Sequence, residues 1–264
     1  MVDSWLSGIA YERFMGRWSD LVAQEFLSWL AVPIVHRAHR WLDVGCGTGS
    51  LTKLILKTCQ PKEIIALDSS RDFISHAQRS ITDPRVHFRV GLAQSLDLDS
   101  NSIDAVVSGL VLNFVPQPKV AISEMLRITK PGGKIGIFVW DYADGMQMLR
   151  YFWDAAVELD INARDLDEGV RFPLCQERQL ESLIREIGLK QIEATPIEVK
   201  TLFQNFDDYW QPFLGGVGPA PSYIMGLNQK DRQKLEDKLR KLLPIDGSGS
   251  ISLVARAWAV KGTA

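Results

Sequence analysis

Short apolar runs alternate with amphipathic segments along the first part of the chain. A run in which nearly every residue is apolar is typical of a strand buried on both faces, whereas apolar residues that recur every three to four positions are typical of a helix. The pattern predicts strands at 40–44, 63–68, 86–90, 103–108 and 134–140, and helices at 19–30, 50–59, 70–80 and 118–128. Because strands and helices alternate, we expect βαβ units around a parallel sheet.

The alternation ends after Trp140. Later helices are predicted at 145–160, 177–187 and 229–242, and later strands at 191–200 and 251–260, with irregular segments between them. The loops that follow the ends of the parallel strands are 45–50, 68–70, 91–95, 108–114 and 140–144. Because ligands on such sheets bind beyond the carboxyl ends of the strands, we expect these loops to share one ligand-binding rim.

A glycine-rich turn joins the first predicted strand to the helix that follows it, in the run Trp41-Leu42-Asp43-Val44-Gly45-Cys46-Gly47-Thr48-Gly49-Ser50. Glycine reaches positive φ and allows a ligand to approach the backbone closely. A helix N-terminus presents backbone N–H groups to a ligand, and Thr48 or Ser50 is available to cap this helix. Ser69 and Asp72 form a possible capping pair for the next helix.

Two classes of nucleotide cofactor compete for this turn. Asp68 follows the second predicted strand and is placed to accept both hydroxyls of a ribose, which either class would offer. An acid at this position disfavours a 2′-phosphate, so NADP is a poor candidate. A dinucleotide site also requires a glycine or alanine where this chain has Ser50.

The composition excludes several other functions. The chain has 264 residues, 46% of them apolar, with a net charge of −2 and no long basic run, so nucleic acids and anionic membranes are poor partners. No apolar stretch approaches the length of a membrane span. Cys46, Cys59 and Cys175 are an odd and scattered set, which indicates reduced thiols in a cytoplasmic protein. No metal site is expected, because His36 and His39 lack a third ligand.

The run Leu42–Gly49 resembles motif I of class I S-adenosylmethionine-dependent methyltransferases. The similarity extends to Asp68, to Gly91-Leu92-Ala93-Gln94, to Asp104-Ala105-Val106-Val107 and to Pro131-Gly132-Gly133, and covers roughly residues 36–141. Within that superfamily the chain is similar to the ubiquinone/menaquinone-biosynthesis (methyltransferase type 11) small-molecule group. The resemblance implies a Rossmann-like, three-layer α/β sandwich with a mostly parallel seven-stranded sheet and helical lid insertions over its C-terminal edge.

The resemblance also implies a division of the chain and a set of cofactor contacts. A single domain at 1–264 would have its core at about 19–141, 177–202 and 251–261, an N-terminal lid at 1–18 and substrate caps at about 142–176 and 203–250. The residues implied to bind S-adenosylmethionine, or its product S-adenosylhomocysteine, are Tyr11, Arg17, Asp43, Gly45, Cys46, Gly47, Gly49, Asp68, Ser69, Ala93, Gln94, Ser108, Gly109 and Leu110.

Several of these residues also have a purely structural interpretation. Asp43 could only brace the turn, and Tyr11 and Arg17 could clamp the N-terminus without touching a cofactor. Cys46 reads as a small loop residue, because no activating base is nearby in sequence. Relatives often have aspartate where this chain has Leu92, which leaves Gln94 as the substitute partner for the adenine amino group.

Methyl transfer from a sulfonium is an in-line displacement that relies on proximity and on exclusion of water, and it requires no dedicated acid–base pair. Asp141, Tyr142 and Asp208 are candidates to accept a proton from an acceptor. The predicted acceptor pocket is aromatic, which favours a small, largely apolar or aromatic metabolite. Its candidate residues are Phe14, Trp18, Trp140, Tyr142, Phe152, Trp153, Phe172, Tyr209, Trp210 and Phe213, although Phe152 and Trp153 could equally be core.

Two other functions remain open at this stage. A catalytically silent S-adenosylmethionine-binding regulatory or partner protein would keep the glycine turn without the chemistry. An NAD-dependent oxidoreductase is disfavoured by Ser50. We expect a small-molecule methyl acceptor as the partner, no nucleic acid, and a monomer or homodimer.

Overall fold

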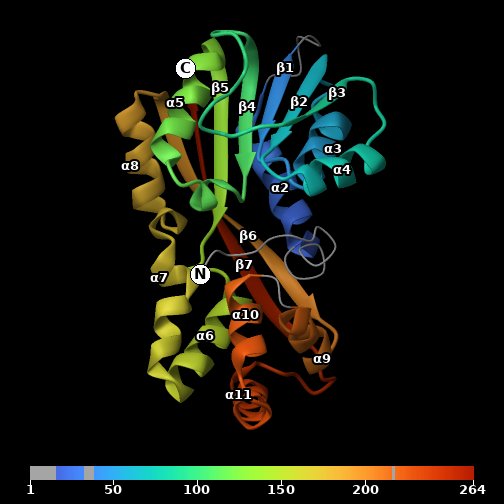
Figure 1. Cartoon of the computed structure of the whole chain (residues 1–264), viewed down its shortest axis with the longest axis vertical. Helices are drawn as coiled ribbons and strands as arrows, with labels where there is room; N and C mark the ends of the chain where they lie inside the picture. The colour runs from blue at the N-terminus through green and yellow to red at the C-terminus, as the bar shows by residue number, and fades with distance from the viewer. Residues whose placement is uncertain (1–15, 33–38, 216–217) are drawn as a thin grey trace.

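The structure is a computed structural model that describes residues 16–32, 39–215 and 218–264 (Figure 1). Its centre is a seven-stranded sheet with the strand order β3-β2-β1-β4-β5-β7-β6. β1 to β5 are parallel to one another, and β7 lies antiparallel between β5 and β6. The predicted mostly parallel, seven-stranded sheet is therefore confirmed. The strands are β1 (Arg40–Val44), β2 (Glu63–Asp68), β3 (Val86–Val90), β4 (Ile103–Gly109), β5 (Thr129–Trp140), β6 (Lys190–Phe203) and β7 (Ile251–Thr263).

Helices cover both faces of this sheet. On one face α2 packs against α3 and against β6 and β7, and on the other face α5 packs against α8 (Figure 1). The strands between these layers are buried on both sides, which explains why β1, β2 and β4 are mostly apolar. The helices of the two layers are α2 (Arg17–Leu30), α3 (Ser50–Thr58), α4 (Arg71–Ser80), α5 (Pro118–Ile128) and α8 (Glu177–Ile187).

The helix starts differ from the predicted caps. α3 begins after Gly49, which has a φ of 90°, and no side chain caps it, so neither Thr48 nor Ser50 has the predicted role. α4 is capped by Ser70, whose Oγ accepts a hydrogen bond from the Phe73 N–H at 3.3 Å, and not by Ser69. At the other end of a helix, Gly188 forms the C-cap of α8 with a φ of 94°.

β6 and β7 extend well beyond the end of β5. β5 pairs with β7 only over 257–263, whereas β6 pairs with β7 from Lys190 to Phe203 along the whole length of β7. The two strands therefore run beyond the end of β5 as a two-stranded extension, and a group of helices surrounds it (Figure 1). Both strands are longer than predicted. Buried and exposed side chains keep alternating to Phe203, so the extension has a packed face along its length.

The helices around this extension form the cap, which we define as residues 142–176 and 203–250. Phe152 and Phe213 stack there with ring centroids 4.7 Å apart, and the cap and the sheet share one continuous cluster of buried apolar residues. The cap elements are α6 (Gln147–Leu159), η3 (Ile161–Leu166), α7 (Glu168–Arg171), η4 (Pro173–Cys175), α9 (Phe206–Trp210), η5 (Gln211–Gly215), α10 (Pro219–Gly226) and α11 (Gln229–Leu242).

An ion pair fastens the start of the cap to the sheet. Asp141 follows β5 and is 1% exposed. Its Oδ2 lies 2.6 Å from Arg256 Nη2 and accepts a bond from Arg256 Nε at 2.7 Å, while its Oδ1 accepts the Asp144 N–H at 2.9 Å. Both oxygens are thus occupied, and β5 is tied to β7 at the point where the chain leaves the sheet.

We expect Arg256→Leu to cost about 2–3 kcal/mol of unfolding free energy, because it leaves the Asp141 carboxylate buried without a counter-charge. The loss should stay below that for a fully buried pair, since the Arg256 side chain is 26% exposed. Urea unfolding measures it. Arg85→Leu is the matched control, because the pair of Arg85 with Asp83 is more exposed and should contribute about 0–1 kcal/mol. Equal losses in the two variants would contradict the structural role of Asp141.

Candidate functional site

The last two residues of β2 form hydrogen bonds to loops that were predicted to share one ligand-binding rim. The Leu67 carbonyl accepts the Gly45 and Cys46 N–H groups at 2.7 and 3.0 Å. The Asp68 carbonyl accepts the Gly91 N–H at 2.9 Å, and the Asp68 carboxylate accepts the Gly47 N–H at 2.9 Å. The glycine turn, the end of β2 and the exit of β3 therefore meet, as predicted.

The three glycines of the turn have different reasons to be glycine. Gly45, Gly47 and Gly49 have φ values of 76°, 54° and 90°, a region that disfavours other residues. A Cβ at Gly45 would lie 2.5 Å from Val111 Cγ1, so Gly45 is needed for packing. A Cβ at Gly47 would meet no atom within 4 Å. Gly47 thus borders open space, where a ligand can approach the backbone.

Asp43 is a buried acid with one oxygen unpaired. It is 1% exposed, and its Oδ2 accepts a bond from Thr52 Oγ1 at 2.6 Å. Its Oδ1 has no hydrogen-bond partner. Burial raises the pKa of Asp43 to about 7, although the Thr52 bond acts in the opposite direction. A buried carboxylate with a vacant acceptor suits a positively charged ligand group.

Asp68 is fixed by backbone donors on both oxygens. Oδ1 accepts the Ser70 N–H at 2.8 Å and Oδ2 accepts the Gly47 N–H. Burial raises the pKa of Asp68, and these bonds act against the rise. Each oxygen keeps a further lone pair, so the carboxylate can still accept ligand hydroxyls. Ser69, beside it, is exposed.

The ends of β3 and β4 complete the rim. Ala93 is buried and Gln94 half-buried, whereas the Leu92 side chain is 56% exposed. Ser108 Oγ donates to the Val44 carbonyl at 2.9 Å, so this hydroxyl joins β4 to β1 inside the sheet. Leu110 has a φ of 62° and its N–H donates to the Phe138 carbonyl at 2.7 Å, which turns the chain sharply after Gly109.

Cys46 has the properties of a packing residue. It is 6% exposed, and burial raises the pKa of its thiol well above the usual value, with the charges of Asp43 and Asp68 adding to the rise. A thiol of this kind is a poor nucleophile at neutral pH. The structural interpretation of Cys46 is the one that the geometry supports.

Arg17 is bound to the cap. Its Nη1 donates to Asp208 Oδ1 at 2.8 Å and its Nη2 donates to the Leu202 carbonyl at 2.7 Å, while the guanidinium lies 4.1 Å from the centroid of the Trp18 ring. This is the clamp that the sequence left open as an alternative to cofactor contact. Tyr11 and Phe14, which were grouped with Arg17 and Trp18, lie outside the described residues.

The same contacts bear on the candidate proton acceptors. The hydrogen bond from Arg17 lowers the pKa of Asp208, which makes its carboxylate a weaker base. Asp141 is ion-paired with Arg256 through one oxygen and bonded to the backbone through the other. These two acids therefore have structural roles. Tyr142 is 4% exposed and lies next to Phe172, with ring centroids 6.0 Å apart.

Most aromatic residues assigned to the acceptor pocket form the core of the cap. Tyr209 donates its hydroxyl to the Met148 carbonyl at 2.9 Å, and the Trp153 Nε1–H donates to Glu168. Phe172 is half-buried and packs edge-to-face on Phe114, which follows β4, at 5.1 Å. The pocket candidates that are at most 6% exposed are Trp18, Trp140, Tyr142, Phe152, Trp153, Tyr209, Trp210 and Phe213.

Sequence reasoning missed two buried polar residues, one directly after β4 and one in the cap. Both amide atoms of Asn113 are buried without a hydrogen-bond partner. Glu168 is 2% exposed, and burial raises its pKa to about 7. Neither residue belongs to a recurring motif, and their burial depends on segments distant in sequence, so no local signal could have identified them.

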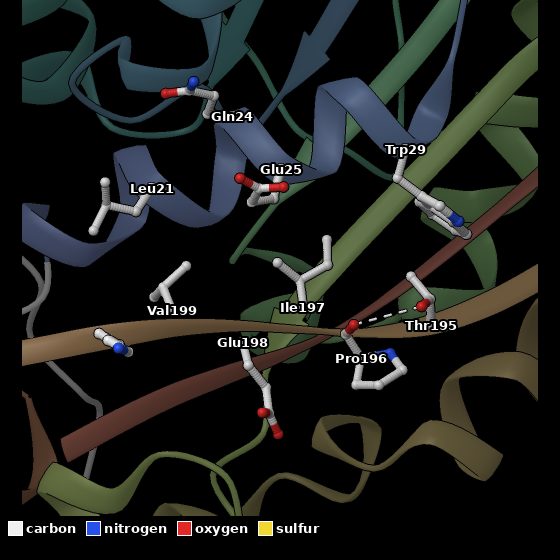
Figure 2. A pocket seen from close by; sticks show the side chains of 10 residues that line it. Leu21, Gln24, Glu25, Trp29, Thr195, Pro196, Ile197, Glu198 and Val199 are labelled. Atoms are coloured by element: carbon white, nitrogen blue, oxygen red, sulfur yellow. Dashed lines mark hydrogen bonds between the residues drawn. The ribbon is translucent and has the colours of Figure 1, made fainter.

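A surface groove of about 600 Å³ lies elsewhere, between α2 and the outer strand β6 (Figure 2). β6 is at the opposite end of the strand order from β3, and the groove contains none of the rim residues. It is therefore separate from the candidate site. The side chains in Figure 2 include Leu21, Gln24, Glu25 and Trp29 from α2, and Thr195, Pro196, Ile197, Glu198 and Val199 from β6.

The described ranges lack both a membrane-spanning helix and a metal-binding cluster. None of their helices is both long enough and apolar enough to cross a membrane. Nor does any group of three or more His, Cys, Asp or Glu side chains within those ranges have the arrangement to hold a metal ion.

Comparisons with known proteins identify the central part of the chain. Residues 42–137 match the family model described as a methyltransferase domain. An uncharacterized methyltransferase of Mycobacterium tuberculosis is 33% identical over 135 residues, which are 51% of this chain and 50% of that protein. A demethylmenaquinone methyltransferase of Renibacterium salmoninarum is 37% identical over 119 residues, 45% of this chain and 46% of that protein. The chain thus spans about half the length of the curated relatives it matches.

The whole fold also has solved counterparts. The phosphoethanolamine N-methyltransferase 2 of Haemonchus contortus, solved in complex with S-adenosyl-L-methionine, superposes with a TM-score of 0.59 at 17% identity. That match covers 97% of this chain and 56% of the other. At this identity the likeness shows the Rossmann-like fold alone.

The roles of Gly45 and Gly47 in the glycine turn can be separated by substitution. We expect Gly45→Ala to cost about 2–4 kcal/mol, because it adds a clash with Val111 to the strain of a positive φ. Gly47→Ala should cost only about 1–2 kcal/mol, since strain alone opposes it. Denaturant unfolding of the two variants provides the comparison. A loss for Gly47→Ala as large as that for Gly45→Ala would show that the space beside Gly47 is not open.

Proposed function

We propose that the protein transfers a methyl group from S-adenosylmethionine to a small, largely apolar or aromatic metabolite, and the match of residues 42–137 to the family model of a methyltransferase domain supports this. The observation that carries the proposal is the combination at the rim. Three features lie around one glycine turn. They are the open space beside Gly47, the Asp68 carboxylate with unused lone pairs, and the Asp43 oxygen that has no hydrogen-bond partner. These groups match the backbone, ribose and ammonium contacts that the donor requires.

The residues present fit the donor from end to end. Asp68 would accept the ribose hydroxyls, and Ser69, Ala93 and Gln94 would flank the adenine. Asp43 would bind the ammonium group with Oδ1, which has no protein partner. The bound donor supplies an activated methyl group, so the chain has to orient donor and acceptor in line and exclude water.

The proposal assigns no general base. Asp141 and Asp208 are paired with Arg256 and Arg17, and the chemistry does not demand an acid–base pair. On this view both carboxylates fasten the cap that shields the reaction from water. The acceptor would be enclosed by the cap, at 142–176 and 203–250, and by the N-terminal segment 1–18. Phe172 and Tyr142 would lie beside the acceptor.

The acceptor class rests on charge and on aromatic content. The net charge of −2 offers no attraction to polyanions, and the rings of Phe114, Phe172 and Tyr142 pack together between the end of β4 and the cap. One relative is a demethylmenaquinone methyltransferase, whose name indicates an aromatic quinone-type acceptor. A cytoplasmic location and a monomer or homodimer belong to the same proposal.

Calorimetric titration with S-adenosylhomocysteine tests the donor site. We expect binding to the wild-type protein, and Asp68→Ala should weaken it at least tenfold, or about 1.4 kcal/mol, because two ribose hydroxyls lose their acceptor. Asp72→Ala is the control, since Asp72 is exposed on the first turn of α4 and holds no loop of the rim.

Each alternative function predicts a different result in this titration. Binding of NAD but not of S-adenosylhomocysteine would favour an oxidoreductase. Binding of S-adenosylhomocysteine without methyl transfer to any member of an acceptor panel would favour the catalytically silent protein. No binding of either ligand would refute the proposal.

The pKa of Asp43 predicts how donor binding depends on pH. Burial raises this pKa to about 7, so below that pH the carboxyl is neutral and attracts an ammonium group weakly. Affinity for S-adenosylhomocysteine should fall roughly tenfold or more from about pH 7.5 to about pH 5.5. Asp43→Asn should bind weakly and lose most of this dependence, with Asp68 contributing the remainder because its pKa is also raised. Titrations at several pH values check this, and an unchanged slope in Asp43→Asn would contradict it.

A further inference from the structure

The amide of Asn113 is the starting point. Asn113 lies in η2 (Leu112–Phe114), directly after β4, and its Oδ1 and Nδ2 are both buried without a partner. Within the described part of the chain, no other side chain has two buried polar atoms that both lack a hydrogen-bond partner. Buried amides are normally satisfied, because leaving one unpaired lowers stability. A ligand that offers one acceptor and one donor would satisfy both atoms.

The neighbours of Asn113 place it beside the donor site. The Val111 side chain occupies the space in which a Gly45 Cβ would lie, 2.5 Å from Val111 Cγ1, so this loop packs on the glycine turn. On its other side Phe114 packs on Phe172 of the cap at 5.1 Å. Asn113 is therefore between the glycine turn and the cap.

The strand order separates the two ends of the donor. β4 is on one side of β1, and β2 and β3 are on the other. Asp68 and Gln94, which the proposed function assigns to the adenosine half, follow β2 and β3. The amino-acid half must then extend toward β1 and β4, where Asp43 and Asn113 lie.

We propose that Asn113 binds the amino-acid end of the methyl donor, an inference that rests on the proposed function. The Nδ2 amide donates to the α-carboxylate and Oδ1 accepts from the α-ammonium group, which Asp43 also binds. A zwitterion offers the acceptor and donor that the two amide atoms lack, whereas an apolar acceptor molecule would leave them unpaired. Arg17 is not available for the carboxylate, since its guanidinium is bonded to Asp208 and to the Leu202 carbonyl.

Two ligands that differ only at this end provide the test. S-adenosylhomocysteine carries the amino-acid group, and 5′-methylthioadenosine keeps the adenosine and the sulfur but lacks that group. Asn113→Leu replaces the amide with an apolar side chain of similar size. Gln117→Leu is the matched control, because Gln117 is an exposed amide four residues further on with no side-chain bond to the helix that it precedes.

We expect Asn113→Leu to weaken S-adenosylhomocysteine binding at least tenfold and 5′-methylthioadenosine binding less than threefold, whereas Gln117→Leu changes neither. The unliganded Asn113→Leu protein should melt at the wild-type temperature or higher, because it no longer buries unpaired polar atoms. A purely structural role would instead lower the melting temperature and weaken both ligands alike.

The outcomes distinguish this inference from the proposed function. Wild-type binding of S-adenosylhomocysteine that Asn113→Leu leaves unchanged, or equal losses for the two ligands, would overturn the role of Asn113 and leave the donor site standing. Failure of the wild-type protein to bind either ligand would overturn the proposed function, and the inference with it.

Discussion

The end of β2 is the constraint on which the candidate site depends. The Leu67 carbonyl and the Asp68 carbonyl and carboxylate accept five backbone N–H groups, from the glycine turn, from the start of α4 and from the exit of β3. The Asp68 carboxylate itself accepts the Gly47 N–H of the turn and the Ser70 N–H at the start of α4. Because its oxygens keep lone pairs, the same group can hold the turn and still face a ligand.

The cap follows from a second constraint, the length of β6 and β7. Their pairing beyond the end of β5 gives the cap helices a surface to pack on, so the cap shares the hydrophobic core of the sheet. The ion pair of Asp208 with Arg17 joins the cap to α2, and the ion pair of Asp141 with Arg256 joins the end of β5 to β7 just before the cap begins. Asp141 and Asp208, which the sequence suggested as proton acceptors, therefore have structural roles.

The sequence was sufficient for the order of the elements, the parallel sheet and the shared rim, because apolar runs and glycines are local signals. It was insufficient where a partner is distant. Asp141 is 115 residues from Arg256, and Asp208 is 191 residues from Arg17, so neither ion pair leaves a trace in local sequence. Aromatic content also could not separate core from pocket at Phe152 or Trp153, since either location favours large rings. The cap at Ser70 rather than Ser69 is an error of one residue, the usual scale of uncertainty at a helix start.

Asp43 and Glu168 show why burial alone does not define a site. Burial raises the pKa of each to about 7. Glu168 accepts a bond from Trp153 inside the cap, where it fixes the position of α7, while Asp43 keeps one oxygen vacant beside the glycine turn. The unpaired atoms of Asp43 and Asn113 lower the stability of the unliganded protein, and a zwitterionic ligand would reverse that loss on binding. The proposed preference for a ligand with an amino-acid end therefore rests on the polar groups that the fold leaves unsatisfied.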